Sequence, residues 1–225
     1  MVSLILHIDT AVQAASVSLS DDATVINTLV NPSTKESASW LHVAIQDILQ
    51  QNNYSPNQLS AIAVSAGPGS YTGLRVGMAT AKGLCYALSV PLITVDTLKM
   101  MASAIKEPLT DLLCPMIDAR RQEVFTAIFD KELHNVLPAS NLILSERSFQ
   151  DHLQKHTITF FGNGSLKAST VIKHSNAFFV NSVATAQDMV FLASEKYKSG
   201  QFSDLAYSEP FYGKDFHSPI SKKNY

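Results

Sequence analysis

Residues 61–77 (AIAVSAGPGSYTGLRVG) come closest to a known binding chemistry. Their apolar start suits a buried strand, Gly67-Pro68-Gly69-Ser70 turns the chain, and Thr72 is predicted to cap a helix that runs to Leu88. A strand, a glycine-rich turn and a helix N-terminus are the usual parts of an anion site. The spacing matches neither common phosphate motif, because Gly-Lys-Ser/Thr is missing and Gly73 lies one position late for a dinucleotide fingerprint. A standard nucleotide loop is therefore not predicted.

The densest charged group is Asp118, Arg120, Arg121 and Glu123, on a predicted turn. In an active site it would supply an acid and cations for an anionic substrate. In a structural role it would form ion pairs, since arginine pairs in a bidentate manner with carboxylates. We interpret it as an ion-pair group that joins two domains.

Metal and nucleophile patterns are weak. A zincin helix needs His-Glu-x-x-His, but between His152 and His156 Leu153 stands in place of the glutamate, so we expect two surface histidines. Ser70 lacks the flanking glycines of a nucleophile elbow. No catalytic residue and no metal ligand is predicted.

The predicted helix after the glycine-rich turn carries small residues every four positions, at Gly73, Gly77, Ala81 and Cys85, so they share one face. A glycine inside a helix costs up to about 1 kcal/mol relative to alanine. Another backbone must therefore approach this face closely. It belongs either to a helix of the same chain or to a partner.

Composition narrows the function classes. The chain has 225 residues, 46% hydrophobic and 16% charged, with a net charge of −2, which indicates a globular protein without the basic excess of an independent RNA binder. A local basic patch at Arg120-Arg121 remains open. Two cysteines, Cys85 and Cys114, are typical of a reduced compartment. Without a signal-like start or a run of about 20 apolar residues, no membrane association and a cytoplasmic location are expected.

The pattern of apolar residues alternates between strands and helices. An Ile-Asp strand end at residues 8–9 has a weak echo at 117–118, which suggests two related halves, 1–105 and 106–225. The expected strands are 4–8, 14–19, 24–29, 59–65, 91–95, 112–117, 124–129 and 157–161, and the expected helices are 35–51, 72–88, one from Asp96 or Thr97, 146–155 and 184–198, with 204–225 mainly extended.

Three ordered motifs resemble the TsaB (YeaZ) family: residues 67–77 followed by Ala-Lys-Gly-Leu at 81–84, ILHIDTA at 5–11, and IDARRQEVF at 117–125. The resemblance covers residues 4 to about 130. It implies a duplicated α/β fold of the ribonuclease H-like/actin-like (ASKHA) type, with two related halves that each have a mixed sheet flanked by helices.

The resemblance also implies a function. It indicates a non-catalytic scaffold subunit, without activity alone, that works with a TsaD-like catalytic paralogue and a TsaE-like ATPase. Together they transfer threonylcarbamoyl to the adenosine beside the anticodon of tRNA. No cofactor is intrinsic, ATP and metal belong to the partners, and tRNA is bound only through the complex. The rival interpretation, a stand-alone actin-like ATPase or kinase, lacks a second phosphate motif and a catalytic aspartate.

The resemblance further implies an interface formed by the helices 35–51 and 72–88, which would serve the catalytic paralogue or a homodimer. The predicted interface residues are Trp40, Leu41, Gly73, Leu74, Gly77, Met78, Ala81 and Cys85. In actin-like ATPases the corner at Asp9-Thr10 holds phosphate, but no lysine or second aspartate lies nearby here. These two residues are either a weak nucleotide contact or the cap of a local turn.

Overall fold

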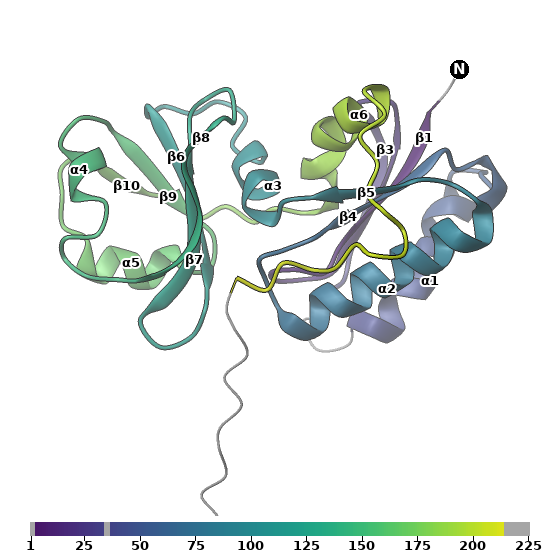
Figure 1. Cartoon of the computed structure of the whole chain (residues 1–225), viewed down its shortest axis with the longest axis horizontal. Coiled ribbons are helices and arrows are strands. Elements are labelled where there is room, and N and C mark those ends of the chain that lie inside the picture. The colour runs from purple at the N-terminus through teal and green to yellow at the C-terminus, as the bar shows by residue number, and fades with distance from the viewer. Residues whose placement is uncertain (1–2, 34–36, 214–225) are drawn as a thin grey trace, which may run out of the picture.

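The computed structural model describes residues 3–33 and 37–213, which form two lobes side by side (Figure 1). Each lobe contains a five-stranded mixed sheet, in the order β3-β2-β1-β4-β5 in the first and β8-β7-β6-β9-β10 in the second. In both sheets the first three strands are antiparallel and the last three are parallel. The strands are β1 Leu4–Asp9, β2 Ser16–Asp21, β3 Thr24–Val30, β4 Ala61–Ser65, β5 Leu92–Val95, β6 Leu112–Asp118, β7 Glu123–Phe129, β8 Asn135–Ile143, β9 Ile158–Phe161 and β10 Ala177–Phe179.

This repeated strand order confirms the predicted duplicated α/β fold of the ASKHA type, with two related halves that each carry a mixed sheet flanked by helices. The hairpins β1–β2 and β6–β7 were both expected from the Ile-Asp echo. Strands β8 and β10 and the helix α5 (Ser165–Val171) were not predicted.

Two long helices, α1 (Ser37–Gln51) and α2 (Tyr71–Leu88), cover one face of the first sheet (Figure 1). The predicted start of α1 at residue 35 lies outside the described residues. The cap of α2 is Ser70 and not the predicted Thr72, because the Ser70 hydroxyl accepts a hydrogen bond from the Gly73 amide at 3.3 Å. In the described part of the chain, no helix has both the length and the apolar character needed to cross a membrane.

A short helix, α3 (Thr97–Ser103), lies between the two lobes (Figure 1). Its start at Thr97 agrees with the predicted start at Asp96 or Thr97, and Asp96 caps it by accepting from the Lys99 amide at 2.7 Å. Leu98 and Met101 pack with apolar residues of the second sheet, whereas Met100 packs with those of the first. The helix α3 therefore contributes side chains to the apolar core of each lobe.

The C-terminal region departs from the predicted division at residue 105. The 3-10 helix η2 (Ala186–Met189) and α6 (Val190–Lys198) return to the first lobe and cover the face of its sheet opposite to α1 and α2 (Figure 1). The residues after α6 also pack on the first lobe. Ser203 forms an isolated antiparallel β-bridge with Leu92, and the Phe211 amide donates to the Ala66 carbonyl at 2.7 Å. The second lobe thus does not include all of 106–225, and the predicted extended tail from 214 lies outside the described residues.

In the second lobe the predicted helix 146–155 was too long, because α4 spans only Gln150–Leu153. In the first lobe the short 3-10 helix η1 (Pro56–Gln58) was not predicted. Around α4 the chain forms turns instead, with Phe149 at φ +62° before the helix.

The sheet face beneath η2 and α6 contains a buried histidine. His7 on β1 is fully buried, and its Nε2 lies 2.8 Å from the Ser20 hydroxyl, which itself donates to the Asp22 carbonyl. Nδ1 of His7 has no hydrogen-bond partner in the described structure. Burial lowers the pKa of His7 from 6.5 to about 3.

This histidine makes folding stability depend on pH. The unfolded chain takes up a proton at residue 7 below about pH 6.5, whereas the folded chain does so only near pH 3. The stability contributed by neutral His7 is therefore complete above pH 6.5 and is lost as the pH falls. We expect the stability advantage of the wild type over His7→Gln to shrink by about 1.4 kcal/mol per pH unit in that window.

Urea unfolding of both proteins at pH 7.5, 5.5 and 4.5 measures this difference. Other titrating groups, such as the buried Asp9, are common to both proteins and cancel. Parallel stability curves for the two proteins would contradict the assignment.

Candidate functional site

The glycine-rich turn between β4 and α2 is packed against the chain that follows β1. The Ser70 amide donates to the Ala11 carbonyl at 2.6 Å. A Cβ atom at Gly69 would overlap the Ala11 carbonyl oxygen, and one at Gly73 would overlap that of Thr10. The backbone of this turn therefore packs directly against the backbone of Thr10 and Ala11.

Asp9 and Thr10 are used inside this corner. One carboxylate oxygen of Asp9 accepts from the Ala11 amide at 3.0 Å and from the Ser65 hydroxyl at 2.6 Å. The Thr10 hydroxyl donates to the Gly73 carbonyl at 2.7 Å. Burial raises the pKa of Asp9, and these hydrogen bonds oppose the rise. Asp9 and Thr10 therefore cap the local turn after β1, which is the second of the two predicted roles.

The stripe of small residues on α2 packs inside its own lobe. A Cβ atom at Gly77 would overlap the Thr10 hydroxyl and touch Val64. Of the two interpretations left open by the sequence, contact within the chain therefore holds, although the neighbour is the end of β1 and not a helix. The residues that are buried are Leu41, Gly73, Leu74, Gly77, Met78, Ala81 and Cys85.

This burial corrects the predicted interface. The residues named above cannot touch a partner in this conformation, and Trp40 is itself partly buried against the same core. Burial also raises the pKa of the Cys85 thiol to about 11, as expected of a core cysteine. Helical periodicity had identified the residues of one face correctly, but that face points inward.

The outer faces of α1 and α2 remain accessible. Val43 is 56% exposed and Tyr86 82% exposed, and nothing lies within 4 Å of a Cβ placed at Gly83. A groove of about 390 Å³ lies in this region. Its lining residues are His42, Ile45, Gln46, Leu49, Gln50, Tyr54, Pro56 and Leu84.

The charged group on the β6–β7 turn is organised within the second lobe. Asp118 forms its ion pair with Lys167, at 2.7 Å, and the same ammonium donates to the carbonyls of Arg121 at 3.0 Å and Glu123 at 2.6 Å. Burial would raise the pKa of Asp118, but its hydrogen bonds from Lys167 and the Arg120 amide outweigh this and lower it. The predicted pairing with arginine across two domains is replaced by this contact.

Lys167, on α5, was missed by sequence reasoning. It lies 49 residues from Asp118 in the chain, and no local pattern links the two. The Glu123 carboxylate accepts from the Asn141 side chain at 2.8 Å, which is also within the second lobe.

The space between the lobes is a cleft of about 420 Å³. It lies at the carboxyl ends of parallel strands, where ligands commonly bind in α/β folds. Asp9 and Thr10 do not line it, whereas Asp118 and Arg120 do. The lining residues are Ala11, Val12, Gly69, Ser70, Tyr71 and Thr72 from the first lobe and Ile117, Asp118, Ala119, Arg120, Phe125 and Asn163 from the second.

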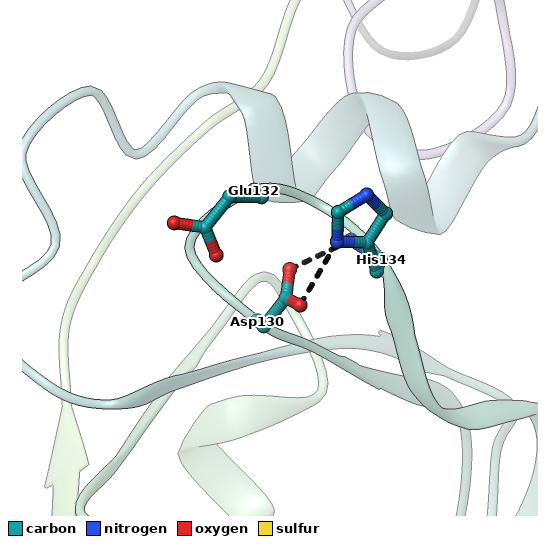
Figure 2. Close-up of side chains that lie close together, drawn as sticks. All are labelled: Asp130, Glu132 and His134. Carbon is teal, nitrogen blue, oxygen red and sulfur yellow. Dashed lines mark hydrogen bonds and ion pairs between the residues drawn. The ribbon is translucent and has the colours of Figure 1, made fainter.

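A second charged group, Asp130, Glu132 and His134, lies on the β7–β8 turn (Figure 2). Asp130 accepts from the His134 amide at 2.8 Å and its other oxygen lies 3.1 Å from Nδ1 of His134. Glu132 and His134 are exposed. These contacts between Asp130 and His134 close the hairpin, and Glu132 lies exposed beside them.

Comparison with known proteins places the chain in a family. The family model "TsaD: tRNA N6-adenosine threonylcarbamoyltransferase" matches residues 29–212. The Escherichia coli K12 protein named "tRNA threonylcarbamoyladenosine biosynthesis protein TsaB" is 30% identical over 217 residues, which cover 92% of this chain and 93% of that protein. This chain belongs to the TsaB (YeaZ) family. The Bacillus subtilis TsaB protein is 32% identical over 145 residues, which are 63% of each chain.

Solved structures agree on the fold of this TsaB-family chain. YeaZ from Pseudomonas aeruginosa gives a TM-score of 0.79 at 24% identity and covers 93% of this chain and 99% of its own. The activator of 2-hydroxyisocaproyl-CoA dehydratase from Clostridium difficile gives 0.53 at 8% identity, covering 88% and 97% of the two chains, so it shares the fold alone.

The close contact at Gly73 can be tested by adding a single methyl group. We expect Gly73→Ala to destabilise the TsaB-family fold by about 1–3 kcal/mol, because the Cβ atom meets rigid backbone. Gly83→Ala, in the same helix but facing open space, should stabilise it by about 0.5–1 kcal/mol.

Thermal and urea unfolding of the two variants provide the measurement. Gains in stability for both would show that α2 is free to move away from Thr10, contrary to the packing described above.

Proposed function

We propose that this chain is a non-catalytic scaffold subunit in the synthesis of threonylcarbamoyladenosine in tRNA. It would act with a TsaD-like catalytic paralogue and a TsaE-like ATPase to modify the adenosine beside the anticodon. The observation that carries the proposal is the match, over nearly the full length of both chains, to a relative named for tRNA threonylcarbamoyladenosine biosynthesis. A cytoplasmic location, where tRNA is found, is part of the proposal.

The packed corner after β1 supports a scaffold over an independent enzyme. An actin-like ATPase or kinase would need its first phosphate corner open to a ligand. Here the Thr10 hydroxyl donates a hydrogen bond to the Gly73 carbonyl on α2. The Asp9 side chain is 1% exposed and accepts a hydrogen bond from the Ser65 hydroxyl. We therefore assign the handling of ATP and metal to the partner subunits.

The outer faces of α1 and α2 are the docking surface we propose for the catalytic paralogue. Two helices with small or short side chains outward, such as Ala79 and Gly83, allow another helix pair to approach closely. Val43 and Tyr86 would supply apolar area. A homodimer through the same faces is the alternative when the paralogue is absent.

Reconstitution tests the function directly. We expect unmodified tRNA to be threonylcarbamoylated by a TsaD-like protein, a TsaE-like protein and the enzyme that supplies threonylcarbamoyl-adenylate only when this chain is added. This chain alone should neither hydrolyse ATP nor modify tRNA. Equal product without it would refute the scaffold proposal, and ATP turnover by the isolated chain would favour the rival enzyme.

A charge on the docking surface should separate assembly from folding. We expect Val43→Glu to weaken association with the catalytic paralogue at least tenfold, because a carboxylate would be buried without a partner. Its thermal midpoint should hardly change, since the side chain is exposed.

The matched control is Leu166→Glu, which places the same charge on α5 of the second lobe, at a side chain that is 79% exposed. Calorimetric titration with the paralogue compares the two variants. Equal affinities for both would exclude the outer face of α1 as the docking surface.

A further inference from the structure

The β6–β7 turn is built from residues that fit its backbone poorly. Arg120 has φ +66° and Arg121 φ +48°, so two successive arginines adopt the left-handed conformation. Hairpin turns with two positive φ values normally use glycine, asparagine or aspartate, because a longer side chain is strained there. The chain therefore keeps two arginines at a position where glycine would be more stable.

The surrounding structure holds this strained turn in place. Lys167 donates to Asp118 and to the carbonyls of Arg121 and Glu123. The Asp118 carboxylate accepts from the Arg120 amide at 2.6 Å, and the Asp118 amide donates to the Asn163 side chain at 2.8 Å. Strain of this kind persists only where neighbours over-determine the backbone, and it gathers at functional positions.

The side chains of Arg120 and Arg121 reach solvent. Both arginines are exposed, and within residues 3–33 and 37–213 neither guanidinium forms an ion pair or a hydrogen bond. The nearby carboxylates are already engaged, Asp118 by Lys167 and Glu123 by Asn141, and the Arg120 charge acts on Asp118 only as a minor electrostatic contribution.

Several lysines, in contrast, are used within the chain. Lys82 donates to the carbonyls of Ala206 and Ser208, and Lys196 donates to that of Thr94. Lys198 pairs with Asp22 at 2.9 Å. The arginine turn therefore differs from these cations both in its strain and in its lack of an internal acceptor.

We propose that the Arg120-Arg121 turn binds phosphate groups of an RNA backbone, and this inference rests on the proposed function in tRNA modification. The planar guanidinium matches phosphate oxygens in a bidentate manner, which an ammonium does not. Arg120 lines the interlobe cleft, where Ser70, Thr72 and Asn163 offer further polar groups. Because the net charge is −2, the contact is local and positions RNA already bound by the complex.

The test uses the complete complex with the double variant Arg120→Gly/Arg121→Gly. Glycine relieves the positive φ, so the thermal midpoint of this chain should rise or stay constant. The affinity of the complex for unmodified tRNA should fall at least tenfold, with a higher KM for tRNA and little change in kcat. The slope of log affinity against log salt should become shallower by about one to two.

A matched control is Ser89→Gly, at the C-cap of α2, where a non-glycine residue also has a positive φ of 54°. It should relieve similar strain while leaving tRNA affinity and the salt slope unchanged. A purely structural turn predicts that both variants gain stability and that neither changes tRNA binding.

The two levels of the proposal fail differently. If the wild-type complex does not modify tRNA, the proposed function fails. If the wild-type complex works and the double variant retains its tRNA affinity and salt slope, the phosphate contact is overturned while the function stands. Loss of the paralogue from the double variant, instead of loss of tRNA, would also overturn it and assign the turn to a protein contact.

Discussion

The contact between the backbone after β1 and the start of α2 is the constraint on which the first lobe depends. At Gly69 and Gly73 the two main chains approach so closely that no Cβ atom fits. This contact sets the position of α2 on the sheet and buries its stripe of small residues. It also fills the corner where an actin-like enzyme would place phosphate, and it forms one wall of the interlobe cleft.

The second lobe repeats the strand order but uses the equivalent corner differently. Its strand-to-helix turn also contains glycines, and Cβ atoms at Gly162 and Gly164 would crowd the backbone of Met116 and Ile117. On the hairpin beside it, however, Lys167 of α5 donates to the carbonyls of Arg121 and Glu123, and the two arginines of that turn are exposed. The two corners that face each other across the cleft are thus a closed backbone contact on one side and an exposed cationic turn on the other.

This asymmetry suits a protein that works through its surfaces. The first lobe has a core on both faces of its sheet, since η2 and α6 return to cover the face opposite α1 and α2. Its outer helix faces are then free for a partner, and α3 connects the core of the first lobe to that of the second. The connection through α3 would therefore fix the position of the proposed docking surface on α1 and α2 relative to the proposed phosphate contact on the β6–β7 turn.

The sequence alone determined the local features of this protein, namely the strand alternation, the two hairpins, the long helices and the motifs that identify the family. These follow from periodicity and turn chemistry, which act over a few residues. Only the tertiary structure decided what packs on each face. It showed that Gly77 meets Thr10 and that α6 belongs to the first lobe. Lys167, as the partner of Asp118, also emerged only there. The physical reason is that a repeat of four residues specifies which side chains share a face, whereas the neighbour of that face depends on contacts between segments far apart in the chain.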